Sequence, residues 1–344
     1  MVDADRRISV GRIVPAIVDD DSTHRRSTAT FAQWVEVHRL AVAGREPAIA
    51  RHAGHGVARL WLGRSRFADV EALAHATLTL GPDAGAFYDL GWAQSYTGQR
   101  RCALESYEQA LHLYREADDH GNEAATLSNI GHVHHRLGDL QQGLTYYRQA
   151  LPIQQEFGNH AGEAITLNNI GRDYDEFGDR QQALTYYQQA LPIQQDIGDR
   201  AAEATTLNNI GGVYDDGLGD SQQGLAYYQQ ALPIQQEIGH RAGQATTLNN
   251  IGHAHHTLGD PQQALTYYRQ ALTIRREVGD RAGEAITRYN VAMVNRDQGN
   301  LDEAIDEMEL VIDIDRQVGH TALGADTAVL EQLRRELAEE QQTT

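Results

Sequence analysis

A block of about 40 residues recurs along the middle of the chain, and this internal repeat constrains the fold more than any other feature. The strings SNIGHVHHRLGD (128–139), NNIGRDYDEFGD (168–179), NNIGGVYDDGLGD (208–220) and NNIGHAHHTLGD (249–260) follow one another at this interval. The third string carries one extra residue, which we assign to Gly217, and weaker copies begin at Tyr88 and Tyr289. Such a chain folds by stacking similar units, so its 344 residues need no single central core.

Each repeat has the pattern of two helices. In the repeat around Asn169, Ala164, Leu167 and Ile170 fall on one face of a helix. Gly178 then supplies a left-handed helix stop, and Asp179 caps the next helix with a glutamine three residues later, as in a capping box. The second helix is expected to bury Ala183, Leu184, Tyr187, Ala190 and Leu191. The sequence therefore predicts an all-α fold.

A proline lies inside the second helix of three repeats, at Pro152, Pro192 and Pro233. Each removes a hydrogen bond to the carbonyl four residues earlier, at a cost of about 3 kcal/mol in an isolated helix. Because the three prolines share one register, we predict that the bends they cause add to the curvature of the array.

These residues resemble the tetratricopeptide repeat family. With Gly171 at position 8 of the family's unit, Ala183, Tyr187 and Ala190 fall at positions 20, 24 and 27. The usual unit has roughly 34 residues, so the longer unit here implies longer helices. The long form resembles the repeats of Pins/LGN-type adaptors and kinesin light chains, and the repeat arrays of actinobacterial signalling NTPases and antibiotic regulators.

The resemblance implies an all-α, right-handed superhelical solenoid of about seven helix pairs with a leading helix and a C-terminal capping helix. We expect a flexible arm over 1–26, a leading helix over 27–45 and a repeat array over 46–320. A charged final helix and tail over 321–344 would cover the end of the array. The expected repeats lie near 46–82, 84–120, 121–159, 160–199, 200–240, 241–280 and 281–320.

Charge and composition exclude several classes of protein. The net charge is −19: residues 1–101 carry 13 Arg and 11 acids (+2), and the remainder carries 16 Arg and 37 acids (−21), which disfavours nucleic acid. The chain has no lysine, which excludes a Walker A loop or a Schiff-base lysine, and its single cysteine excludes a cysteine-based metal cluster. No apolar stretch is long enough to span a membrane, and the N-terminus is a poor secretory signal, so we expect a cytoplasmic protein.

In the family that the chain resembles, the first helix of each repeat lines a concave groove, and position 6 points into it. That position holds Asn129, Asn169, Asn209, Asn250 and Asn290. An asparagine amide has one acceptor and two donors, so it can pair with both the N–H and the C=O of an extended peptide. This resembles the asparagine ladder by which several family members hold a peptide backbone. Alternatively, these amides bond only to neighbouring helices, or reflect recent duplication.

The other groove positions differ between repeats, whereas the packing positions do not. We propose as side-chain selectivity residues an aromatic end (Tyr88, Trp92, Tyr96), a basic zone (His132, His135, Arg136, Arg172), an acidic centre (Asp175, Glu176, Asp215, Asp216), a second histidine pair (His253, His256) and Arg296. The acidic centre suits Arg or Lys on a partner, so we hypothesise an extended peptide with a basic segment. The alternatives are drift at solvated positions and, for the aromatic residues, packing against the preceding repeat.

Catalysis and metal binding have less support in the sequence. His132/His135 and His253/His256 have a spacing that can place two imidazoles on one metal, but no third ligand follows at a fixed spacing. Carboxylates such as Asp175 on neighbouring repeats would need a closed pocket for acid–base work, and no catalytic motif is present. We therefore predict no enzyme activity, no cofactor and no metal.

Three functions remain as hypotheses. The first is a scaffold that binds a peptide segment of a protein partner, with no nucleic acid and no membrane. The second is a regulatory sensor acting on a separate NTPase or transcription factor. The third is a histidine-rich site for a metal or a small molecule, with or without catalysis. Residues 1–26 are a candidate internal ligand of the groove, and the sequence leaves the oligomeric state open.

Overall fold

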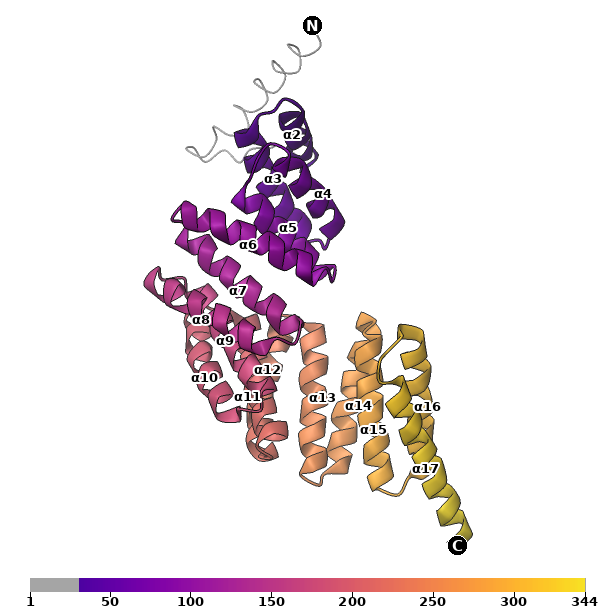
Figure 1. Cartoon of the computed structure of the whole chain (residues 1–344). Coiled ribbons are helices and arrows are strands. Elements are labelled where there is room, and N and C mark those ends of the chain that lie inside the picture. Colours follow the sequence, from indigo (N-terminus) through magenta and orange to yellow (C-terminus); the bar gives the residue numbers. More distant parts are fainter. Residues whose placement is uncertain (1–30, 344) are drawn as a thin grey trace. The chain divides into compact units, whose positions relative to one another are not determined.

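The computed structural model describes residues 31–343, and every regular element in this range is a helix (Figure 1). The arm expected over 1–26 lies outside the described residues. The helices are α2 (Phe31–Ala43), α3 (Pro47–Leu62), α4 (Phe67–Leu78), α5 (Ala84–Tyr96), α6 (Arg100–Glu116), α7 (His120–Arg136), α8 (Leu140–Glu156), α9 (His160–Glu176), α10 (Arg180–Asp196), α11 (Arg200–Gly212), the π-helix η2 (Val213–Gly217), α12 (Ser221–Glu237), α13 (Arg241–Thr257), α14 (Pro261–Val278), α15 (Arg281–Asp297), α16 (Leu301–Val318) and α17 (Leu323–Thr343).

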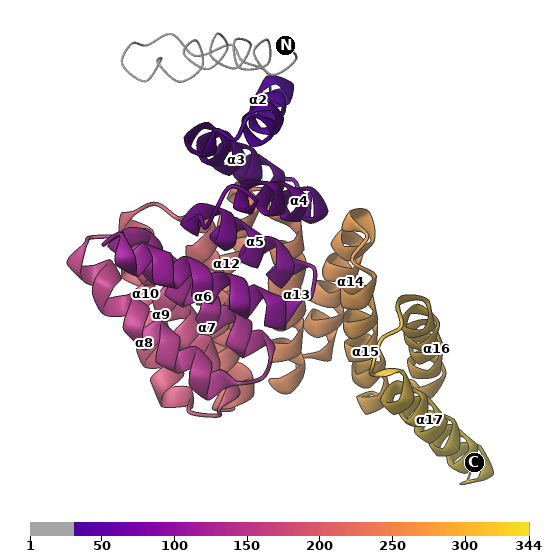
Figure 2. The same ribbon diagram turned by 45° about the horizontal axis from the view of Figure 1, so that its top comes forward.

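The helices form two compact units, with the boundary inside α9 between Asn169 and Ile170. In the first unit, each helix from α2 to α8 packs on the next one along the chain. In the second unit, α13 to α16 likewise stand side by side in sequence order, as Figures 1 and 2 both show. The described residues thus contain the predicted all-α repeat array, with α3 to α16 as seven helix pairs. No described helix combines the length and the apolar character that crossing a membrane requires.

The two helices of a repeat meet where a glycine of the first lies against a buried tyrosine of the second. A Cβ placed on Gly252 would lie 2.7 Å from the ring of Tyr268, and one on Gly171 would lie 2.8 Å from Tyr187. The glycine is therefore needed for close approach of the helices. Gly56 of the first pair has no neighbouring atom within 4 Å of such a Cβ, so this contact is not repeated there.

The helix stop and the helix cap predicted from the sequence are both present, but one hydrogen bond of the predicted capping box is missing. Gly178 adopts the left-handed conformation (φ +84°), and the Asp179 carboxylate accepts a hydrogen bond from the backbone N–H of Gln182 at 3.1 Å. The second half of the capping box is not seen, because the Asp179 N–H donates instead to the carbonyl of Tyr174 at 2.9 Å. The C-terminal turn of the first helix thus uses the donor that the box would need.

The sequence predicted two irregular features, namely the prolines inside three helices and one inserted residue. Helices α8, α10 and α12 continue through Pro152, Pro192 and Pro233, and all three prolines are exposed. The extra residue Gly217 ends the π-helix η2, which adds one residue to the last turn of the first helix of its repeat. The chain absorbs this insertion without breaking the helix pair.

The last helix, α17, covers the end of the final pair. Leu330 and Leu333 are buried in one cluster with residues of α16 such as Met308. Arg296, which the sequence suggested for the far end of a groove, donates from Nε to Glu336 of α17 at 2.9 Å. This arrangement is the one expected of a capping helix.

Candidate functional site

The asparagines predicted to form a ladder lie on the first helices of successive repeats. In the second unit, Asn290 donates through Nδ2 to Oδ1 of Asn249 at 3.2 Å, and Thr287 donates to the same oxygen at 3.0 Å. Asn250 likewise donates to Asn208 at 3.4 Å. One donor of each amide is thus used between repeats, which is the alternative role considered from the sequence.

The remaining polar groups of these amides are not used inside the array. Asn250 and Asn290 are partly exposed, and neither makes a further hydrogen bond with a described residue. Each therefore keeps Oδ1 and a second N–H for another molecule. In the first unit, Asn129 donates to the hydroxyl of Tyr88 at 2.9 Å, and Asn169 is partly exposed. Asn209, in the second unit, is also partly exposed. The contacts within the array do not preclude peptide binding by these amides.

In the second unit, the structure brings together Asp215, Asp216 and His253. Nδ1 of His253 lies 3.1 Å from Oδ2 of Asp215 and 3.5 Å from Oδ1 of Asp216. One ligand atom from each residue lies within 4.8 Å of the other two, and carboxylate and imidazole are both metal ligands. His256 does not join this cluster, because its Nε2 lies 2.9 Å from Asp297. The two histidines of the predicted pair thus have different carboxylate partners.

Burial and the hydrogen bond between His253 and Asp215 together shift the pKa values of this cluster. Asp215 is 5% exposed, and its Oδ1 is buried without a hydrogen bond to any described residue. The hydrogen bond to Asp215 raises the pKa of His253, burial opposes this effect, and the charges of both carboxylates add to it. Burial raises the pKa of Asp216. The cluster is thus a partly buried imidazole–carboxylate contact that becomes an ion pair when His253 is protonated.

The other charged residues predicted in the second unit have mixed surroundings. Asp175 forms an ion pair with Arg180, which offsets one charge of the predicted acidic centre. Glu176 and Asp216 are exposed. Nε and Nη2 of Arg172 are buried without a hydrogen bond to a described residue. Glu176 and Asp216 are therefore the solvent-accessible carboxylates of the predicted acidic centre.

In the first unit, the aromatic end splits into a packed part and an open part. Tyr88 packs edge-on against Trp92 at 6.0 Å and Tyr107 at 5.7 Å, consistent with partial packing in the core. Tyr96 is 63% exposed and stacks on Phe67 at 5.1 Å. The rings of His132 and His135 lie nearly parallel at 6.2 Å, and Arg136 is exposed.

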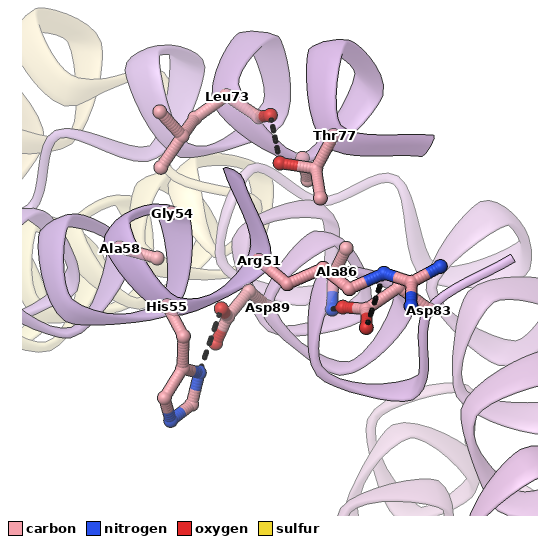
Figure 3. A pocket seen from close by; sticks show the side chains of 10 residues that line it. Arg51, Gly54, His55, Ala58, Leu73, Thr77, Asp83, Ala86 and Asp89 are labelled. Atoms are coloured by element: carbon pink, nitrogen blue, oxygen red, sulfur yellow. Dashed lines mark hydrogen bonds and ion pairs between the residues drawn. The ribbon is translucent and has the colours of Figure 1, made fainter. Parts of the chain in front are cut away.

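The aromatic residues line an open cleft of about 640 Å³. Its other lining residues include His55 and Arg59 of α3, Asp89 of α5 and Asn122 of α7. Figure 3 shows the His55 ring facing the Asp89 carboxylate, with Nδ1 to Oδ2 at 3.2 Å. Asp89 is 3% exposed, and its hydrogen bond to His55 raises the pKa of the imidazole. Burial raises the pKa of Asp89, and the bond to His55 opposes this change.

A comparison with protein families agrees with the repeat geometry. The family model described as "Tetratricopeptide repeat" matches residues 122–196, 202–277 and 244–317, which together make up more than half of the chain. The chain belongs to the tetratricopeptide repeat family. The repeats of this family are generally non-catalytic scaffolds, and the chain matches no curated protein in sequence.

Solved structures of other tetratricopeptide repeat proteins have the same architecture. A signal transduction ATPase with numerous domains and a tetratricopeptide repeat sensor, from Pyrococcus horikoshii, superposes with a TM-score of 0.68 at 14% identity, over 97% of this chain and 54% of that one. Aspartyl phosphate phosphatase F from Bacillus subtilis gives 0.59 at 12% identity, over 91% and 96%. A Rap protein complexed with competence and sporulation factor gives 0.56 at 14% identity, over 90% and 98%. At these identities, the likeness establishes the fold.

The site residues predicted for this tetratricopeptide repeat chain include Tyr88, Trp92 and Tyr96 but not the other residues that line the cleft, such as His55, Arg59, Phe67 and Asp89. One signal was present, because Asp89 occupies the place in its repeat that asparagine has in the ladder. The first repeat deviates from the common pattern, so nothing in the sequence indicated which face of α3 lies beside α5.

Proposed function

We propose that this protein is an interaction scaffold that binds an extended polypeptide segment of a protein partner along its first helices. The observation that carries the proposal is the state of the ladder amides. Asn250 and Asn290 are each held by one N–H and keep the other polar groups of the amide for a ligand. A side chain that is already fixed loses less entropy on binding, so such amides are preorganised for a peptide backbone.

The charge of the array supports a partner with a basic segment. Residues 102–344 carry a net charge of −21, and Glu176 and Asp216 are exposed near ladder positions. Complementary charge accelerates association and excludes acidic competitors. We place this function in the cytoplasm, without a membrane or nucleic acid partner.

The test compares two double variants in affinity capture from a lysate of the source cells, followed by mass spectrometry. Asn250→Ala with Asn290→Ala removes the amides offered to a ligand. The matched control, Asn208→Ala with Asn249→Ala, removes the acceptors of the same inter-repeat bonds but keeps the ladder amides. Circular dichroism first establishes that both variants are folded.

We expect a partner that the intact protein captures, that the control captures in reduced amount because its ladder amides are no longer held, and that the ladder variant loses. Overlapping peptides of that partner should then contain one segment that binds directly, and methylation of its backbone nitrogens should abolish binding. Equal capture by all three proteins would contradict the proposal. A captured NTPase or transcription factor would identify the scaffold as a regulatory sensor.

A further inference from the structure

We propose that the cleft in the first unit, lined by α3, α5 and the start of α4, binds an aromatic side chain of the partner that has a carboxylate beside it. This inference rests on the proposed scaffold function and specifies the chemistry of one anchor in the bound segment. The cleft has a volume of about 640 Å³. Sites for compact ligands usually measure about 300–1,000 Å³, so the cleft is large enough for one bulky side chain and its neighbours.

The aromatic character of the ligand follows from the wall of the cleft. Phe67 and Tyr96 stack with their ring planes 13° apart, and Tyr88 and Trp92 meet edge to face at 85°. Tyr96 nevertheless remains 63% exposed, so the wall presents a large apolar surface to solvent. Aromatic groups bind to one another in stacked and edge-to-face geometries, and both are available here to a further ring.

The carboxylate follows from Arg59. This guanidinium is exposed at the cleft and makes no ion pair or hydrogen bond with any residue from 31 to 343. Two other arginines of the first helix pair have acidic partners, because Arg51 lies 3.3 Å from Asp83 and Arg66 lies 2.7 Å from Asp69.

The other two charged groups of the lining, His55 and Asp89, form a pair of their own. His55 and Asp89 pair with each other at 3.2 Å, so a protonated His55 balances an ionised Asp89. When His55 is protonated, the lining therefore has a net charge of +1, which comes from Arg59. A carboxylate is its natural partner, since guanidinium binds this group with two parallel hydrogen bonds.

Continuity with the ladder favours a polypeptide over a free small molecule. Tyr88, which lines the cleft, accepts a hydrogen bond from Asn129, the first ladder amide. A segment whose backbone reached Asn129 would therefore meet the cleft directly. The anchor and Asn129 then belong to one binding surface within the first unit.

The probe is a fluorescein-labelled peptide, Gly-Ser-Asp-Phe-Asp-Ser-Gly, whose binding to the full-length protein is followed by fluorescence anisotropy. Replacing Phe by Ala should weaken binding about tenfold or more, because the buried apolar surface is lost. Replacing both Asp by Asn should weaken it about fivefold, which is the range of an exposed ion pair. This second difference should largely disappear in about 0.5 M NaCl, where charges are screened.

Two pairs of protein variants test the assignment of the cleft. Arg59→Gln should abolish the preference for Asp over Asn, whereas Arg101→Gln, at an exposed arginine of α6 away from the cleft, should keep it. Tyr96→Ala should weaken the Phe peptide about threefold to tenfold. Phe157→Ala, which removes a ring that is 56% exposed elsewhere in the same unit, should not.

Several outcomes would overturn the inference: equal binding of the Asp and Asn peptides, tighter binding of an Arg-Phe-Arg peptide, or no effect of Arg59→Gln. N-acetyl-L-phenylalanine binding as tightly as the peptide would also overturn it, since the site would then be one for small molecules. If the peptides fail while the captured partner still depends on Asn250 and Asn290, this inference falls and the scaffold function stands. If no partner depends on the ladder, the proposed function fails as well.

Discussion

At the scale of single residues, the protonation of His253 is coupled to a nearly buried carboxylate. Nδ1 of His253 lies 3.1 Å from Asp215, and this hydrogen bond is the main cause of the raised pKa of the imidazole. A raised pKa means that the folded protein holds the proton more tightly than the unfolded chain does. The resulting stabilisation is complete below the unfolded pKa of about 6.5 and is lost as the pH rises through the folded pKa.

We therefore predict that His253→Gln lowers the urea midpoint most below about pH 6 and progressively less as the pH rises toward 8. Asp215→Asn should remove the same pH-dependent difference, and the double variant should add little to it because both substitutions break one interaction. Urea denaturation followed by circular dichroism at several pH values measures this. A difference that stays constant from pH 5 to 8 would contradict the coupling.

At the same scale, the ladder asparagines were predicted from the sequence but their hydrogen-bond acceptors were not. The equivalence of the five asparagines follows from the repeat, because a 40-residue period places equivalent residues on equivalent helix faces. Their role in a groove was predicted from the resemblance to the family. The acceptor of Asn290, Asn249, was not predicted, although it stands at the preceding position of the neighbouring repeat. Finding it requires the lateral offset between stacked helices, which depends on packing contacts such as that of Gly252 with Tyr268.

At the scale of helices, the interior prolines are tolerated because they are exposed. The carbonyls that lose their partners lie one turn before Pro152, Pro192 and Pro233 and near the solvent-facing side of each helix. The equivalent residue of α14 is Thr273, whose hydroxyl donates to the carbonyl of Arg269 at 2.9 Å. The repeat with a threonine thus gives a natural reference for the repeats with a proline.

We predict that Pro192→Thr raises the free energy of unfolding by about 1–3 kcal/mol, because the helix regains a backbone hydrogen bond and loses a steric clash. Chemical denaturation of this variant and of the triple variant at Pro152, Pro192 and Pro233 measures the effect. Small-angle scattering of the triple variant tests whether the prolines contribute to curvature. A loss of stability would show that the bend is required for packing between repeats.

Helix pairs and their stops were predictable because their signals are local, whereas the outcome of an insertion was not. Tyr214 stacks on Tyr227 at 5.6 Å, as Tyr174 does on Tyr186 at 5.5 Å in the preceding repeat. This contact keeps the first helix in register up to Tyr214. The extra residue must then be absorbed between Tyr214 and the left-handed Gly219, and a π-turn does so. The sequence identified the added residue but not this contact between neighbouring helices.

At the scale of the whole molecule, stability comes from contacts between neighbours, as expected for a repeat array. The terminal helix pair of such an array has a neighbouring pair on one side only. A capping helix therefore stabilises this pair by burying its second face. Here α17 buries Leu330 and Leu333 against α16. The sequence predicted this cap from the position and charge of the final segment, but not the pairing of Arg296 with Glu336 that attaches it to α15.

We predict that deletion of residues 323–344 destabilises the last helix pair by about 3–6 kcal/mol, the value of burying two leucine side chains. Because each repeat contacts only its neighbours, the loss should be local. Hydrogen exchange should accelerate in α15 and α16 and remain unchanged in α3 to α8. Arg334→Gln, which breaks only an exposed ion pair with Glu309, should have an effect of less than about 1 kcal/mol. Faster exchange throughout the chain after the deletion would instead mean that the array unfolds as one cooperative unit.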